Sequence, residues 1–305
     1  MATVRDASGV LAKLLNGGHS TIAGRLAPPR ETSPYVNRIR LLWQKMREPV
    51  IGRFPKAPGL PRNIGAYMKR VDDAYVTDAY HSLSIEGYRV SRELIERVRS
   101  NTWNPETNEQ DRGQRDAMAA LGYWQAYQAV QKSMRRVLNG ENPGSVADED
   151  HGTWYRETFG PSVTAGLLKP ADLAGYRNGQ VYIRRSMHVP LNREAVRDAM
   201  PAFFDLLREE KEPAVRVALG HFVFVYIHPY MDGNGRMGRF LMNLMMASGG
   251  YPWTVIPVGD RKIYMEALEK ASVGEDIVPF ADFLSGLVKK GLAGAPLPAV
   301  PKTES

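Results

Sequence analysis

Two apolar segments that enclose a short polar stretch constrain the fold of this chain more than any other feature. Residues 214–227 and 240–247 are mostly apolar, and residues 228–239 between them read HPYMDGNGRMGR. Apolar runs of this length indicate buried helices. Pro213 lies at a favoured first-turn position of the first helix, and Pro229 with two following glycines ends it. The sequence therefore predicts two core helices joined by a polar turn.

The polar turn contains the groups that an anion-binding site needs. Gly233 and Gly235, which flank Asn234, let backbone N–H groups approach an anion closely, and both can adopt positive φ. A helix expected from Arg236 onward would direct its free N–H groups and the positive end of its dipole at the same anion. Arg236 and Arg239 are three residues apart, so they share a helix face and could both reach one polyphosphate.

Two more side chains of the turn add chemistry to this site. Asp232 supplies a hard oxygen ligand of the kind that suits Mg²⁺ between phosphates. His228 has an ordinary pKa near neutrality, so it can take a proton from an incoming hydroxyl group. The alternative is a polar loop between helices that carries His and Arg by chance.

The twelve residues resemble the active-site motif of the Fic (Fido) family, H-P-F-x-D/E-G-N-G-R-x-x-R, and differ at a specified position only in Tyr230, where Phe is usual. That side chain normally faces the core, so the exchange requires only a partner for the hydroxyl group. The resemblance implies a mostly α, Fic-type helical bundle with one small β-hairpin flap. It also implies a protein adenylyltransferase, which moves AMP from ATP to a Ser, Thr or Tyr hydroxyl group of a target protein.

The resemblance further implies a role for each motif residue. His228 would be the general base on the target hydroxyl group, and Asp232 would hold Mg²⁺ between the α- and β-phosphates. Backbone N–H groups and two guanidinium groups would bind the phosphate oxygens and the departing pyrophosphate, and they belong to Gly233, Asn234, Gly235, Arg236 and Arg239.

A second motif lies upstream, where residues 82–87 read SLSIEG. It resembles S/T-x-x-x-E-G/N, the inhibitory motif of Fic proteins, and its place before the core matches the subclass with an N-terminal inhibitory helix. Ser82 and Glu86 are four residues apart and share a helix face, and Gly87 lets the chain turn away. The resemblance implies that Glu86 pairs with Arg239, the arginine that would bind the γ-phosphate of ATP. A surface glutamate at a helix end is the alternative.

The rest of the chain is predicted to be helical, except for one β-prone segment. Helical periodicity or composition indicates helices over 35–46, 63–81, 91–99, 111–138, 148–159, 192–210, 260–271 and 276–290. Residues 179–191 contain two short β-prone runs around a turn, which predict a hairpin, and Pro190 restricts it to an edge or an end. In Fic proteins such a flap docks the target polypeptide by strand addition, and a plain connector is the alternative.

The family also implies an adenosine pocket, with Tyr264 as its aromatic wall. Relatives often follow this tyrosine with an Asn that contacts adenine, whereas Ala271-Ser272 stands here, which leaves the base selectivity open. The expected organisation is an N-terminal arm and helix (1–65), an inhibitory-helix region (66–110), a catalytic core (111–290) and a disordered tail (291–305).

The composition of the chain excludes or disfavours several other classes of function. The chain of 305 residues has no Cys, which excludes disulfides, thiol catalysis and cysteine-based zinc sites. No signal-peptide core and no stretch of about 18 apolar residues is visible, so we expect a cytoplasmic protein without membrane contact. The net charge is +7, but the basic residues are scattered, which disfavours nucleic-acid binding.

The expected partners are ATP, with Mg²⁺ as cofactor, and a protein with an exposed hydroxyl side chain. Self-modification and a homodimer are both compatible with this expectation. Two other functions stay open: another Fic chemistry, such as UMP, phosphocholine or phosphate transfer or removal of AMP, and a non-enzymatic nucleotide- or nucleic-acid-binding regulator. Gly235 argues against the Doc-type kinase variant, which typically has Lys at that position.

Overall fold

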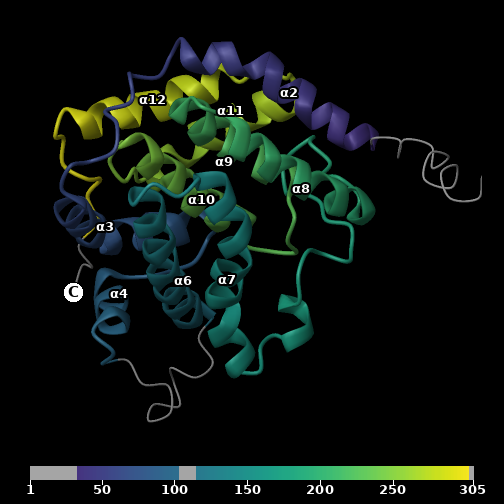
Figure 1. The fold of residues 1–305 in the computed structure, drawn as a ribbon. Coiled ribbons are helices and arrows are strands. Elements are labelled where there is room, and N and C mark those ends of the chain that lie inside the picture. Colours follow the sequence, from purple (N-terminus) through teal and green to yellow (C-terminus); the bar gives the residue numbers. More distant parts are fainter. Residues whose placement is uncertain (1–32, 103–114, 302–305) are drawn as a thin grey trace, which may run out of the picture. The chain divides into compact units, whose positions relative to one another are not determined.

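The computed structural model describes residues 33–102 and 115–301, and those from Tyr35 onward belong to one compact unit. In these residues the regular structure is helical, which confirms the predicted mostly α fold (Figure 1). The α-helices are α2 (Pro34–Ile51), α3 (Ile64–Ile85), α4 (Arg92–Arg99), α6 (Arg115–Leu138), α7 (Pro143–Thr164), α8 (Arg193–Glu209), α9 (Pro213–Ile227), α10 (Asn234–Gly249), α11 (Arg261–Val273) and α12 (Val278–Leu292). Two short 3-10 turns are η1 (Pro170–Leu173) and η2 (Val258–Asp260).

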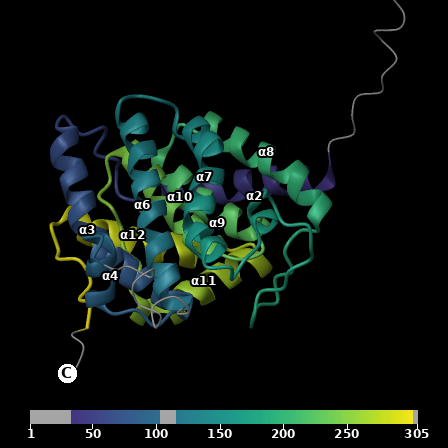
Figure 2. The ribbon, with the colours of Figure 1, turned by 90° about the horizontal axis from the view of Figure 1, so that it is seen from below.

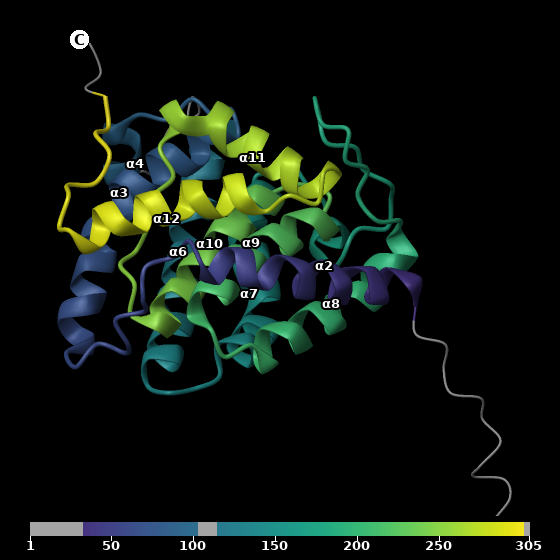
Figure 3. The ribbon, with the colours of Figure 1, turned by 90° about the horizontal axis from the view of Figure 1, so that it is seen from above.

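The two apolar segments form the central helices α9 and α10, which are buried along nearly their whole length. Seen from two opposite sides, they lie between α6 and α7 on one side and α11 and α12 on the other (Figure 2, Figure 3). α9 begins at Pro213, as predicted, and α10 begins at Asn234, two residues earlier than predicted. Their packing places the polar turn between α9 and α10 at the edge of the core.

Residues 179–191, which we call the flap loop, do not form the predicted hairpin. The described residues contain no strand, and the loop shows only a turn in which the Ser186 N–H group donates to the Ile183 carbonyl at 3.1 Å. Several of its backbone groups bond to side chains and not to a facing strand: the Met187 N–H group donates to Glu269 Oε1 at 2.7 Å, and Gln180 Nε2 donates to the Pro190 carbonyl at 3.1 Å. Pro190 has no N–H group to donate. Without a facing row of backbone partners, β-prone residues do not form a ladder.

The chain ends differ in what the structure shows. Of the predicted N-terminal arm and helix (1–65), residues 1–32 lie outside the described residues. The expected disorder of 291–305 does not extend to the part that is described, because α12 continues to Leu292 and Val300 is only 8% exposed. Burial of an apolar side chain favours an ordered segment. Along the described parts of the chain, no helix is long and apolar enough to cross a membrane.

Helices α6 and α7 approach each other closely because Gly122 faces α7. A Cβ atom added at Gly122 would lie 2.0 Å from the Thr158 carbonyl oxygen, so no larger residue fits without a backbone shift. Gly160 on α7 has nothing within 4 Å of such an atom. Substitutions at Gly122 and at Gly160 therefore separate the effect of helix packing on stability from the effect of replacing a helical glycine.

We expect Gly122→Ala to lower the free energy of unfolding by about 1–3 kcal/mol, since the two helices must move apart. Gly160→Ala should raise it by about 0.5–1 kcal/mol, because alanine favours a helix interior. Urea unfolding measures both variants. A Gly122→Ala protein as stable as the parent would contradict the close packing of α6 on α7.

Candidate active site

His228 lies where α9 ends, in a left-handed conformation with φ 55° and ψ 61°. The ring atom Nδ1 is 3.2 Å from the Val225 carbonyl oxygen. A carbonyl oxygen can only accept a hydrogen bond, so this contact places the proton of the neutral ring on Nδ1 and leaves Nε2 as a free acceptor. Such a backbone conformation costs a non-glycine residue about 1–2 kcal/mol, so neighbouring groups must hold it.

The surroundings of His228 keep its ring neutral. Burial lowers the pKa of His228 first, and the positive Arg177 and the ring of His188 lower it further. The hydrogen bond with the Val225 carbonyl and the negative Glu86 oppose this shift without reversing it. At neutral pH the ring is therefore in the form that can accept a proton.

The turn after His228 is fixed by Asn234 and by a glycine. Asn234, which is 2% exposed, accepts the Tyr230 N–H group at 2.9 Å and donates to the Tyr230 carbonyl at 2.8 Å. The Tyr230 ring is buried, as expected, and stacks on Tyr155 with 3.7 Å between ring centroids. Gly233 has φ 80°, and a Cβ atom there would lie 2.8 Å from the Phe159 ring. The Asn234 side chain thus shapes the turn, so only its backbone is available to an anion.

Asp232 and Arg236 lie side by side but differ in exposure. The Asp232 side chain is 62% exposed, and one of its oxygens is 3.6 Å from Arg236 Nη2, which is too long for a hydrogen bond. Arg236 is 1% exposed and lies between the rings of Tyr88 and Phe159, with its Cζ atom 5.1 and 4.8 Å from their centroids. Its Nε and Nη2 groups have no hydrogen-bond partner. A buried cation with free donors is suited to an anionic ligand.

Arg239 is held by the end of α3, as the sequence predicts for the inhibitory motif. Its Nη2 group donates to Glu86 Oε1 at 2.7 Å, and its Nε group donates to Ser82 Oγ at 2.8 Å. Burial would raise the pKa of Glu86, but the charge and hydrogen bond of Arg239 outweigh it, and the pKa is lowered. Glu86 is therefore a carboxylate at neutral pH.

The end of α3 fixes where this carboxylate lies. The Tyr88 N–H group donates to the Leu83 carbonyl at 3.1 Å and the Gly87 N–H group to Ser84 at 3.0 Å, the two bonds of a Schellman cap. Gly87 has φ 88°, which a glycine adopts without strain.

The Glu86 carboxylate reaches the first turn of α10. A Cβ atom added at Gly235 would lie only 2.2 Å from Glu86 Oε1, so the glycine makes room for this oxygen. The N–H groups of a first helical turn have no partner within the helix and attract anions. Glu86 therefore occupies the position at which an anion would bind to α10 and Arg239.

Tyr264 is not on an open surface. The ring is 1% exposed, and its hydroxyl group is 2.7 Å from Nε2 of the buried His221. The structure thus brings together all the motif residues and the inhibitory residues, but it places Tyr264 in the core. Its role in an adenosine pocket stays a prediction.

Sequence reasoning missed Arg177, whose Nε group donates to the His228 carbonyl oxygen at 2.8 Å. It belongs to no motif, and its partners are backbone oxygens that no side-chain pattern announces. It also missed Asp78, which is buried on α3 and accepts the Tyr123 hydroxyl group at 2.6 Å. Burial raises the pKa of Asp78 to about 6.

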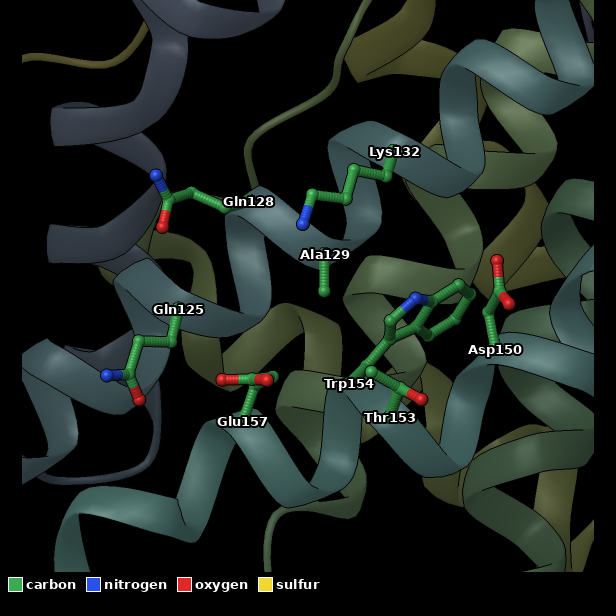
Figure 4. Close-up of a pocket in the computed structure, with 8 residues that line it drawn as sticks. All are labelled: Gln125, Gln128, Ala129, Lys132, Asp150, Thr153, Trp154 and Glu157. Atoms are coloured by element: carbon green, nitrogen blue, oxygen red, sulfur yellow. The ribbon is translucent and has the colours of Figure 1, made fainter.

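Two cavities differ in their relation to this site. One of about 490 Å³ lies beside Asp232 and Arg236, with mainly apolar walls that include Phe159 and Leu168. The other, of about 260 Å³, lies between α6 and α7 and touches no motif residue (Figure 4). Its lining side chains are Gln125, Gln128, Ala129, Lys132, Asp150, Thr153, Trp154 and Glu157. Only the first cavity adjoins the candidate active site.

Comparison with known proteins agrees with the motif. Residues 151–246 match the Fic/DOC family. The "Protein adenylyltransferase Fic" of Nematostella vectensis is 29% identical over 271 residues, which cover 85% of this chain and 59% of the relative. "Protein adenylyltransferase fic-1" of Caenorhabditis elegans is 34% identical over 124 residues, which cover 39% of this chain and 24% of the relative. The chain thus spans about three fifths of the length of the first relative and less of the second.

Two solved structures share the fold. Fic-1 (residues 134–508) from Caenorhabditis elegans has a TM-score of 0.57 at 20% identity, over 85% of this chain and 72% of that chain. A Fic domain containing signaling protein from Bacteroides thetaiotaomicron VPI-5482 has a TM-score of 0.53 at 16% identity, over 87% of this chain and 100% of that chain. At these identities the likeness concerns the fold alone.

The burial of His228 leads to a prediction about its titration. We expect its imidazole to titrate below the ordinary value of 6.5, because desolvation disfavours the charged ring. As the pH falls through that pKa, the ring gains a proton and can no longer act as a base. Proton–carbon NMR of histidine rings measures it, and loss of one signal in His228→Asn assigns it. A pKa at or above 6.5 would contradict the buried, neutral base.

Proposed function

The chain belongs to the Fic/DOC family, and on this premise we propose that it is a protein adenylyltransferase, which transfers AMP from ATP to a Ser, Thr or Tyr hydroxyl group of a protein. One observation supports this most directly. The free Nε2 atom of His228, the start of α10 and the unpartnered donors of Arg236 belong to one turn of twelve residues. In this proposal the base and the donors of a polyphosphate site belong to one short segment of the chain.

The proposed reaction needs one proton transfer and one displacement. His228 Nε2 takes the proton of the target hydroxyl group, whose oxygen attacks the α-phosphorus of ATP in line. The bond from the α-phosphorus to the bridging oxygen of pyrophosphate breaks, and pyrophosphate leaves with its electron pair. N–H groups in the first turn of α10 stabilise the charge that grows on the phosphate oxygens. Arg236 and Arg239 bind the β- and γ-phosphates of the leaving group.

Asp232 would hold Mg²⁺ in this proposal. No group of three or more acidic or histidine ligands that could bind a metal alone occurs in the described parts of the chain. A single exposed carboxylate fits Mg²⁺, which commonly uses one or two carboxylates together with substrate phosphates. The ion would neutralise phosphate charge, while Asp232 fixes where it binds.

We further propose that Glu86 inhibits the enzyme. Its carboxylate pairs with Arg239 and lies against Gly235, so it competes with the γ-phosphate for the same donors. ATP bound in its presence would have misdirected phosphates. Glu86 is anchored at the end of α3. Withdrawal of its carboxylate from Arg239 would therefore require α3 to move or to change its conformation.

A second candidate is transfer of a different nucleotide, such as UMP. It is favoured by the burial of Tyr264 and by Ala271-Ser272 at the position of the usual adenine-binding Asn, because neither position offers the group that the family uses to select adenine. The cytoplasmic location, self-modification and homodimer expected from the sequence also stay predictions.

The test compares wild type, Glu86→Gly and Glu86→Gly/His228→Ala with α-³²P-ATP and Mg²⁺, with label on protein as the measurement. We expect strong labelling only in the single mutant. Loss of the base should lower its rate by about 10²–10⁴-fold while ATP still binds.

Each other outcome contradicts a separate part of the proposal. Equal labelling of wild type and Glu86→Gly would refute the inhibition but not the transfer. Labelling of the double mutant at the rate of the single mutant would refute the base. If the single mutant is labelled by α-³²P-UTP and not by ATP, the second candidate is correct.

A further inference from the structure

The flap loop lacks a β-ladder, so other groups must hold it beside His228. Figure 3 shows it next to one end of α11, where Glu269 accepts the Met187 N–H group at 2.7 Å and also bonds to Ser186 Oγ. These bonds anchor the tip of the loop. Its two ends are joined by Gln180, whose Nε2 group donates to the Pro190 carbonyl at 3.1 Å, and by the side chain of Arg177.

Arg177 joins both ends of the flap loop to the catalytic residue. Its Nη1 group donates to the Gly179 carbonyl at 2.9 Å, and its Nη2 group donates to the Leu191 carbonyl. Its Nε group donates to the His228 carbonyl at 2.8 Å, and its backbone N–H group donates to the Pro229 carbonyl at 2.9 Å. One guanidinium group thus closes the loop and binds the left-handed residue at the end of α9.

The chemistry of this contact is unusual for a buried cation. Arg177 is 2% exposed, and in residues 33–102 and 115–301 it has no carboxylate partner within salt-bridge distance. Burial without an anion is costly, and three carbonyl dipoles replace the missing charge. Only the flat fork of an arginine presents donors in three fixed directions, whereas a lysine is a point donor.

We propose that Arg177 is a positioning residue, which keeps the flap loop closed at its base and His228 in its left-handed conformation. Because it bonds to the backbone of His228 and not to its ring, it acts through that residue and does not itself touch the reacting atoms. The effect on catalysis rests on the proposed function. The effect on the flap loop does not depend on it.

The test removes the donors and keeps the length of the side chain. In the Glu86→Gly background, Arg177→Met should reduce the rate constant of AMP transfer by about 10²-fold, as expected for a base displaced by about 1 Å. The dissociation constant of ATP should change less than about twofold, because ATP binds at residues 232–239, which Arg177 does not contact. Single-turnover rates and calorimetric titration measure the two quantities separately.

Hydrogen exchange gives a measurement that needs no activity. In Arg177→Met, peptides that cover residues 179–191 should exchange at least about tenfold faster, while peptides from α9 and α10 keep their rates. Arg193→Met is the matched control, since this exposed arginine donates to the Asn178 carbonyl at 3.3 Å and pairs with Glu194. It should change neither the exchange nor the transfer rate.

Two further variants keep the test decisive if Arg177→Met does not fold. Arg177→Lys retains the cation without the fork and should show the same faster exchange to a smaller extent. Glu269→Gln weakens only the anchor at the tip, so exchange should rise in residues 183–188 while the affinity for ATP is unchanged.

The outcomes separate this inference from the proposed function. If the Glu86→Gly parent transfers no nucleotide, the proposed function fails, and the exchange of the flap loop still decides the role of Arg177. Unchanged exchange over 179–191 in Arg177→Met and Arg177→Lys would overturn the inference. Equal losses of ATP affinity and transfer rate, with faster exchange throughout the core, would show a merely structural arginine and would also overturn it.

Discussion

The burial of two guanidinium groups at the start of one helix is the constraint on which the rest of the site depends. Arg236 and Arg239 are 1% and 2% exposed, and a buried cation is stable only with partners that replace its water. Arg239 obtains a carboxylate and a hydroxyl group from α3, whereas Arg236 has two aromatic rings and unpartnered donors. Among the described residues both guanidinium groups keep unpartnered donors, which are Nε and Nη2 of Arg236 and Nη1 of Arg239. Only Arg239 is hydrogen-bonded to a carboxylate, and both arginines lie beside the free N–H groups of α10.

Under the proposed inhibition, this difference between the two arginines explains how a single carboxylate controls the site. Glu86 is held at the end of α3 by a Schellman cap, so its position does not depend on a flexible loop. Its pKa is lowered by Arg239, which means that it is ionised at neutral pH and that mild acid does not release it. Below the ordinary carboxyl pKa of about 4.5, the stabilisation from this pair is lost as the pH falls through the lowered value. A change in α3, and not a change in pH, is the physical route to an open site.

Much of the fold and of the candidate site could be predicted from the sequence, because local sequence patterns determine the helices and the two motifs. Apolar runs identified the core helices, and the resemblance of residues 82–87 to the inhibitory motif implied the pairing of Glu86 with Arg239, which the structure contains. The bond from Arg239 to Ser82 was not predicted. The structural role of the Asn234 side chain, which hydrogen-bonds to both backbone groups of Tyr230, could not be predicted in this way. Neither could the contacts of Arg177, because its partners are carbonyl groups that every residue carries. The flap loop was predicted as a hairpin since β-propensity describes side chains and not the partners that a strand finds. Tyr264 was expected at a pocket, although its hydroxyl group meets His221 in the core.

The most direct test of the account asks whether Glu86 occupies the place of the γ-phosphate. Calorimetric titration of ATP and ADP, each with Mg²⁺, into wild type and Glu86→Gly gives the affinity that the γ-phosphate contributes in each protein. In wild type the two nucleotides should bind almost equally. In Glu86→Gly, ATP should bind about tenfold or more tightly than ADP, because a hydrogen bond to a charged group contributes about 1.5–3 kcal/mol. An ATP-to-ADP affinity ratio that is the same in both proteins would contradict the account.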